Sequence, residues 1–203
     1  IGSGAANEVQ TLSVSAQSSN PALIPAPGVT YVSPQTTGTL RFTPLADQWG
    51  SATITVTVSD GVATTARAFL VTVKAVNDAP TLDALAARTV NEDAGQQTVA
   101  LTGIGSGAAN EIQTIVMTAQ SSNELLIPTP SVTYVSPQTS GTLRFTPVAN
   151  GWGSATISLT VSDGVSTTVR AFVVTVTSVD DPPTLDPISD VTVAEDCGTQ
   201  TVI

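Results

Sequence analysis

Histidine is absent from this 203-residue sequence, and cysteine, tryptophan and tyrosine occur only once, twice and twice. The absence of histidine removes the usual general base of acid–base and nucleophilic catalysis, and no nucleophile motif compensates for it. The single cysteine, Cys197, has no partner for a disulfide within the chain. We therefore predict a protein that is not an enzyme.

Basic residues are also scarce, because Lys and Arg number 6 against 16 Asp and Glu, for a formal net charge of -10. So acidic a chain cannot assemble the basic patch that binds nucleic acid or an anionic membrane. No apolar run approaches the roughly 18 residues of a membrane span, so membrane insertion is not expected. Divalent cations, which prefer hard oxygen ligands, are compatible with this charge.

A tandem repeat fills the chain. Each residue aligns without gaps with the one 103 positions later, so that Ile1 matches Ile104 and Trp49 matches Trp152. About two-thirds of the aligned positions are identical, which is far above chance. A period of this length is that of a whole domain, because solenoid units need only about 20 to 50 residues. The sequence therefore predicts modules of one kind joined end to end.

Alternation of apolar and polar residues, without a helical period, runs through each copy. In the clearest segment, 52–58, alanine, isoleucine and valine alternate with threonine. Further segments with strand character are 10–16, 29–32, 39–42, 66–76, 81–90 and 97–101. So many strands in roughly 100 residues predict an all-β fold of tandem antiparallel β-sandwiches.

The repeat frame divides the chain unevenly. If a module begins at Pro80, residues 80–182 form a complete β-sandwich, which we name module 2. Residues 1–79 form module 1, which lacks the first two strands of module 2. Residues 183–203, named the C-terminal tail, match those two strands and belong to a following module or a neighbouring subunit. A sandwich that lacks two strands exposes an apolar groove and unpaired strand edges.

Addition of the C-terminal tail to module 1 of the next subunit would build a head-to-tail homopolymer. Strand addition supplies main-chain hydrogen bonds and places alternate side chains in pockets. Because the contact joins different surfaces, it produces an open filament unless the rotation closes a ring. The alternative is a longer chain, in which adjacent repeats exchange the same strands. The tail residues expected to fill the groove are Leu185, Ile188, Val191, Val193, Val202 and Ile203.

Several motifs carry a family resemblance: Val-Asn-Asp-Ala-Pro-Thr-Leu-Asp at 76–83, Asn-Glu-Asp-Ala-Gly at 91–95 and Val-Ser-Asp-Gly at 161–164. With Leu-Arg-Phe-Thr-Pro-Val-Ala-Asn-Gly-Trp-Gly at 143–153, they resemble the cadherin-like, immunoglobulin-like tandem repeats of large bacterial surface and secreted proteins. The resemblance implies Ig-like or cadherin-like sandwiches. It also implies an extracellular or cell-surface rod, often stiffened by calcium, that serves adhesion, surface layers or filaments.

Calcium is the cofactor that the resemblance implies at module junctions. Asn77 and Asp78 match the linker pair of such junctions, and Glu92 and Asp93 match the acidic position near the start of the next module. Asp60 matches the Asp of the preceding module. Extracellular modules bind calcium with dissociation constants of about 10⁻⁴ to 10⁻³ M, and the alternative is a solvated acidic turn. The repeat adds Asp163, Asp180, Asp181, Glu195 and Asp196 as candidate ligands.

The Gly-rich loop at 2–8, repeated at 105–111, invites comparison with an anion-binding loop. An anion loop of that kind needs a helix after it, and here none is indicated. We interpret the loop as a structural turn, in which Glu8 or Glu111 pairs with Arg41 or Arg67 across strands.

Tryptophan raises the main alternative function. Trp49 and Trp152 precede strands expected to be buried, and we predict that each covers the end of a sandwich core. Exposed rings would instead suit a carbohydrate-recognising accessory or adhesin module. A third hypothesis, glycoside hydrolysis, would require carboxylates facing each other across a cleft at about 5 to 9.5 Å.

Overall fold

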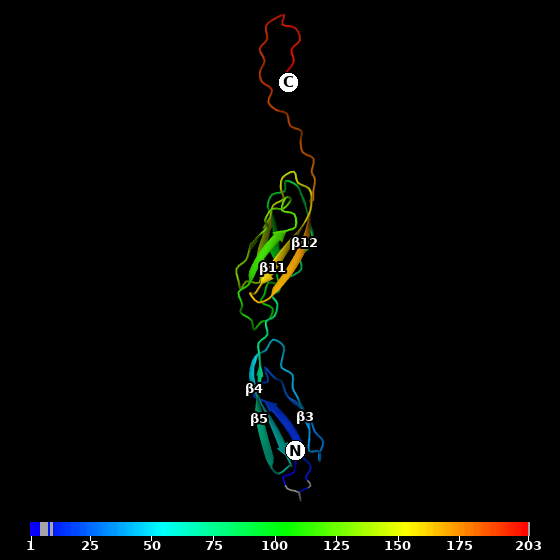
Figure 1. Cartoon of the computed structure of the whole chain (residues 1–203), viewed down its shortest axis with the longest axis vertical. Helices are drawn as coiled ribbons and strands as arrows, with labels where there is room; N and C mark the ends of the chain where they lie inside the picture. The colour runs from blue at the N-terminus through cyan, green and yellow to red at the C-terminus, as the bar shows by residue number, and fades with distance from the viewer. Residues whose placement is uncertain (5–7, 9, 203) are drawn as a thin grey trace.

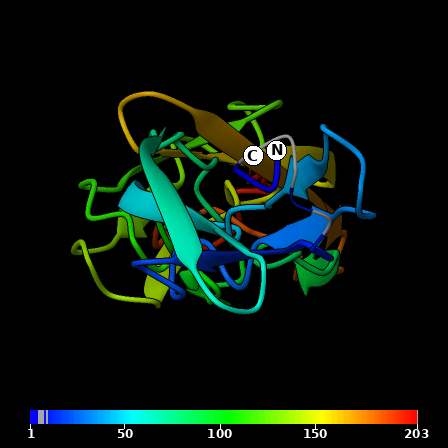
Figure 2. The ribbon, with the colours of Figure 1, turned by 90° about the horizontal axis from the view of Figure 1, so that it is seen from below.

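The structure, a computed structural model, describes residues 1–4, 8 and 10–202. Two modules of β-strands follow each other along one long axis (Figure 1), and the view along that axis superposes them (Figure 2). The strands in this described part of the chain are β1 (Ser13–Ser18), β2 (Gly28–Thr30), β3 (Thr39–Arg41), β4 (Gly50–Ser59), β5 (Thr64–Val73), β6 (Arg88–Asn91), β7 (Gln97–Leu101), β8 (Val116–Ser121), β9 (Ser131–Thr133), β10 (Gly141–Phe145), β11 (Gly153–Ser162) and β12 (Thr167–Thr177).

Five strands are common to both modules. In module 1 one sheet has the order β1-β4-β5, and β2 pairs with β3 in the other. Module 2 repeats these sheets as β8-β11-β12 and as β9 with β10. It then adds β6 to the free edge of β12 and β7 to the free edge of β10. The predicted all-β, Ig-like sandwich is confirmed, and module 2 is larger than module 1 by these two strands.

The direction of β6 differs from the prediction of a wholly antiparallel sandwich. β6 pairs with β12 in parallel, through register partners such as Val90 and Val176. The reason is topological: the chain enters module 2 at one end and leaves it at the other, so its entering and leaving strands run the same way. The segment 81–90 is also shorter as a strand than predicted, because pairing with β12 begins only at Arg88.

The core of module 2 is closed by residues from the segment that contains β6 and β7. Leu82, Val99 and Leu101 are buried there against side chains of the five common strands. The larger members of that common set are Leu143, Phe145, Ile157, Leu159, Phe172 and Val174. Module 1 has a much smaller buried cluster, made of Leu23, Ile24, Ala52 and Ile54. Completion of the core therefore depends on β6 and β7.

Matched positions in the two modules show the effect of these strands directly. Phe172 on β12 is 4% exposed, whereas Phe69 at the same place on β5 is 42% exposed. Phe145 on β10 is 3% exposed, and its counterpart Phe42 is 38% exposed. The rings of Phe42 and Phe69 lie 6.4 Å apart, tilted against each other. The apolar face between the sheets of module 1 is thus open to solvent.

The C-terminal tail continues away from module 2 without joining a sheet (Figure 1). Its described residues, 183–202, form no strand, and their side chains are exposed. The six candidates for filling a groove include Ile203, which lies outside the described residues. The other five are exposed apolar side chains: Leu185, Ile188, Val191, Val193 and Val202.

Truncation of one matched phenylalanine should destabilise the modules unequally. We expect Phe172→Ala to lower the unfolding free energy of module 2 by about 3 to 5 kcal/mol, as for a fully buried ring. Phe69→Ala should cost module 1 less than about 2 kcal/mol, because that ring already contacts water. Urea unfolding followed by hydrogen exchange of peptides from each module measures both. Equal losses of unfolding free energy in the two modules of a monomeric sample would contradict the difference in burial.

Candidate functional site

Asn77, in the linker between the modules, is the centre of a hydrogen-bonded cluster on module 2. Its Nδ2 lies 3.0 Å from Asp163 Oδ2, 3.0 Å from Ser166 Oγ and 3.0 Å from the carbonyl oxygen of Asp78. Its Oδ1 accepts a hydrogen bond of 2.8 Å from Gln113 Nε2. Because one amide both donates and accepts here, it fastens the linker to two separate loops of module 2.

Asp163 is oriented for this contact by the turn between β11 and β12. Its Oδ1 accepts hydrogen bonds from the Val165 N–H at 2.7 Å and the Ser166 N–H at 2.6 Å. The Ser166 N–H and the Asn77 amide hold the pKa of Asp163 below its ordinary value of 3.8, because both stabilise the carboxylate. Asp60 makes the same turn in module 1, where backbone N–H groups alone lower its pKa.

Glu111 forms a second contact with the linker, because its Oε1 accepts a 2.8 Å hydrogen bond from the Asp78 N–H. The predicted pairing of Glu111 with an arginine is therefore replaced by a bond to the linker backbone. Three buried oxygens beside it have no donor within reach: Asn110 Oδ1, Glu111 Oε2 and Gln113 Oε1. Buried acceptors without partners are costly, so this side of the junction is suited to a ligand that supplies positive charge or hydrogen-bond donors.

Glu92 and Asp93 lie at the opposite end of module 2. The buried Glu92 accepts a hydrogen bond of 2.7 Å from the Val179 N–H, and Asp93 Oδ1 accepts one of 3.0 Å from the Asn150 N–H. Val179 follows β12 and Asp163 precedes it, so the whole length of β12 separates these contacts from Asn77. The structure does not bring the four residues of the expected junction together.

The remaining candidate ligands fall into two groups. Asp163 is brought to Asn77, whereas Asp60 remains in its own turn at the far end of module 1. Within residues 1–4, 8 and 10–202, no group of three or more His, Cys, Asp or Glu side chains is placed to hold a metal ion. The acidic residues that follow β12 are exposed: Asp180, Asp181, Glu195 and Asp196.

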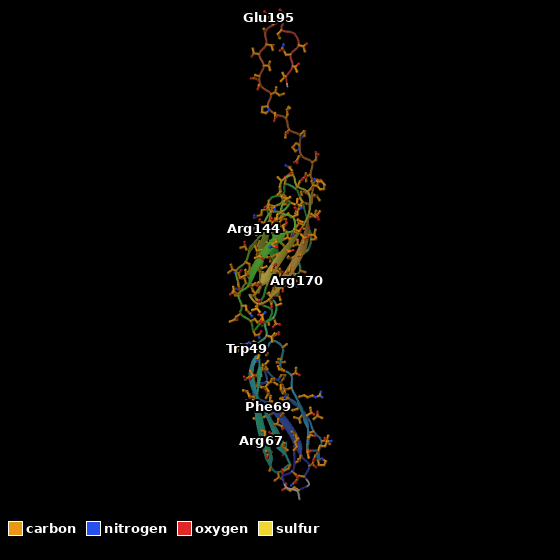
Figure 3. The ribbon with its side chains drawn as sticks, viewed as in Figure 1. Trp49, Arg67, Phe69, Arg144, Arg170 and Glu195 are labelled. Carbon is orange, nitrogen blue, oxygen red and sulfur yellow. The ribbon has the colours of Figure 1, made fainter. Side chains whose placement is uncertain are left out.

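The tryptophans differ from the prediction that they cover the core. Trp49 is 59% exposed and Trp152 is 73% exposed. Leu23 and Leu126 already fill the ends of the two cores, beside glycines at which strands β4 and β11 begin. The preceding tryptophan is therefore left outside the sandwich. Figure 3 places Trp49 at the boundary between the two modules.

Sequence reasoning missed Asn110, Gln113 and Ser166 as junction residues. A signal for the first two was present, because Asn-Glu-x-Gln occurs at 7–10 and again at 110–113 directly after the Gly-rich loop. Asn7 itself lies outside the described residues. Ser166 gave no such signal, because its counterpart at position 63 is alanine.

Comparison with protein families matched one part of the chain. Residues 4–73 match the family described as the bacterial Ig domain. The likeness to the bacterial Ig domain thus lies within module 1, and the 103-residue repeat gives module 2 a similar sequence. Comparison with curated proteins gave no match. The structure contains no helix long and apolar enough to cross a membrane in the residues that it describes.

Solved structures show only a loose likeness. An endo-fucoidan hydrolase from glycoside hydrolase family 107 is 17% identical over 84% of this chain and 24% of its own, with a TM-score of 0.37. Domains 1–6 of the surface layer protein SbsC are 21% identical over 87% of this chain and 21% of theirs, with a TM-score of 0.37. This chain thus spans less than a quarter of the length of either protein.

Removal of the Asn77 amide should change the titration of Asp163 alone. In Asn77→Ala we expect the pKa of Asp163 to rise, because only the backbone donors of the turn, the kind that Asp60 has, would remain. The pKa of Asp60 should not move. Because the pKa of Asp163 is depressed in the folded state, its stabilising contact is present above pH about 4 and is lost as pH falls through the folded pKa. Carboxyl carbon chemical shifts measured against pH check both residues.

Proposed function

We propose that this chain is a structural segment of an extracellular or cell-surface rod built from bacterial Ig-like modules, without catalytic activity. The match of residues 4–73 to the bacterial Ig domain supports the surface-repeat role. The hydrogen bonds around Asn77 support a defined joint rather than a loose tether, because they tie the linker to Asp163 and Gln113 of module 2. Repetition of one such joint would extend the rod in one direction.

The finer proposal is that modules are completed by strands donated from their neighbours. One observation carries it: Phe42, directly after β3, and Phe69 on β5 are exposed in module 1. Their counterparts Phe145 and Phe172 are buried in module 2, where β6 and β7 complete the two sheets. Exposed apolar faces and open strand edges of this kind favour pairing with another segment. Burial of each large side chain would contribute roughly 1.5 to 3 kcal/mol.

The C-terminal tail has the sequence needed for this donation. Leu185 aligns with Leu82 and Val202 with Val99, both of which are buried in module 2. Ile188 and Val193 align with Leu85 and Val90, which pack against the same core. Val191 is the exception, because it aligns with Arg88, whose side chain is exposed on β6.

Two arrangements use this pairing. In a homopolymer, the tail of one subunit completes module 1 of the next, head to tail. In a longer polypeptide, adjacent repeats make the same pairing within one chain. Intact mass measurement of native material distinguishes them, since one very long chain with further repeats would contradict the subunit polymer.

Single substitutions in the tail test the donation. We expect Leu185→Asp to abolish concentration-dependent assembly, because it would place a carboxylate in the position of a buried leucine. Val191→Asp is the matched control and should assemble normally, since its counterpart Arg88 is exposed. Deletion of residues 183–203 should leave monomers. Sedimentation velocity and electron microscopy measure assembly, and filaments formed by the deletion variant would disprove donation by the tail.

We also propose calcium as a ligand of the junction, held by Asp78 and Glu111 with the amide oxygens of Asn110 and Gln113. The unpartnered buried oxygens of Asn110, Glu111 and Gln113 support this choice, because calcium coordinates six to eight oxygens from carboxylates and amides. The calcium ion would satisfy these acceptor oxygens in place of hydrogen-bond donors, and it would join the linker to module 2. Of the expected ligands this set keeps only Asp78, and Glu111, Asn110 and Gln113 replace Asn77, Asp60, Glu92 and Asp93.

Calcium should stabilise the wild-type chain through this set. At free calcium one hundred times the dissociation constant, the gain is about 2.7 kcal/mol, which raises the melting temperature by several degrees relative to chelator. Glu111→Gln should reduce that rise. Asp60→Asn is the matched control, because Asp60 makes the same turn as Asp163 away from the junction. Equal melting of the wild type with calcium and with chelator would remove the ion from the joint.

A further inference from the structure

A groove lies between the modules, beside the linker. It has a volume of about 420 Å³, and its walls come from both sides: Trp49 and Val76 from module 1 and the linker, and Asn110, Ile112 and Gln113 from module 2. A smaller cavity of about 210 Å³, which shares Trp49 and Asn110, continues the groove toward Gln48 and Lys74. Clefts of this size between domains are common binding sites for small molecules.

Two large apolar side chains line this groove without being part of either core. The indole of Trp49 is more than half exposed, and Ile112 is 98% exposed. They belong to different modules and line the same cavity, so the groove has an apolar wall on each side. A junction that served only to hold the modules together would bury these side chains against each other, because their exposure loses the hydrophobic stabilisation of the contact.

The polar groups of the groove select the chemistry of its occupant. Asn110 Oδ1 and Gln113 Oε1 are buried behind the wall of the groove and accept no hydrogen bond, so a ligand with donors would satisfy them once these side chains turn toward it. Lys74 and Gln48 add donors at the smaller cavity. Acidic residues Asp47 and Asp78 also line it and would repel an anionic ligand.

We infer that this groove binds a neutral saccharide, with one sugar ring stacked on Trp49 and its hydroxyl groups donating to Asn110 and Gln113. A sugar ring presents an apolar C–H face to an aromatic ring and hydroxyl donors around its edge, which matches the two kinds of wall. The site requires both modules, because Trp49 and Ile112 are contributed by different ones. It is independent of strand donation. Because the proposed calcium ion would use the same amide oxygens of Asn110 and Gln113, saccharide binding is measured with chelator present.

The chain contains an internal control for the requirement that both modules contribute. Trp152 occupies the place of Trp49 at the end of module 2 and is also exposed. Residues 183–202 align with 80–99, so they hold no counterpart of Asn110 or Ile112. Trp152 therefore has the aromatic surface without the opposite wall, and in this chain it should not bind the saccharide.

Titration of the whole chain with defined neutral oligosaccharides tests the inference. The probes are cellohexaose, maltohexaose, xylohexaose and mannohexaose, and the readouts are tryptophan fluorescence and calorimetry with chelator present. We expect saturable binding of at least one probe. Trp49→Ala should weaken it at least about tenfold, as for an aromatic side chain central to a binding surface. Trp152→Ala should leave it unchanged.

A second variant separates loss of the site from loss of the fold. Ile112→Asp alters only the wall from module 2 and, because Ile112 is exposed, should leave the melting temperature unchanged while weakening saccharide binding. Failure of all four probes to bind the wild type would overturn the inference, as would equal losses in Trp49→Ala and Trp152→Ala. Assembly of the same variants, measured by sedimentation, reports on the proposed rod separately.

Discussion

Burial of the apolar faces in module 2 depends on side chains that arrive from outside the five common strands. Leu82, Val99 and Leu101 close the core over Phe145 and Phe172, which remain only 3% and 4% exposed. The same five strands in module 1, without that cover, keep a small core around Ile24 and Ile54. Most positions of the shared strands are identical in the two modules, including the matched phenylalanines, so the difference in burial comes from the side chains that cover them.

The segment that closes the core also forms the joint between modules. Asn77 contacts Asp163 at the junction, Leu82 is buried five residues later, and β6 and β7 follow. The linker and the two strands that complete a module form one continuous segment. A donated pair of strands therefore brings its linker to the turn that corresponds to the β11–β12 turn of the module it completes. In any arrangement built on this pairing, completion of a sandwich and fixing of its neighbour are therefore a single event.

The sequence predicted the repeat, the sandwich and strands such as β4 and β11, because these depend on alternation within one segment. It could not predict contacts that depend on the length of a folded module. β12 has 11 residues, and at about 3.3 Å per residue it carries Glu92 and Val179 far from Asn77. The prediction grouped Glu92 with Asn77 because they are close in the sequence, but the fold places them at opposite ends of module 2. Exposure of Trp49 was missed for a related reason, since Leu23 had already filled the core end.

One of the changes between the two linkers, from Asn77 to Asp180, has a physical consequence. Asn77 donates to Asp163 at 3.0 Å, whereas the next linker has Asp180 at the matching position. A carboxylate cannot donate there. Two carboxylates at that separation repel each other unless one is protonated or a cation lies between them. The Asn77 joint is held by hydrogen bonds even before an ion binds. A joint between Asp180 and a repeat of Asp163 would hold only when a counter-charge is present. In the proposed rod, the stiffness of each joint would therefore depend on its sequence and on the cations in solution.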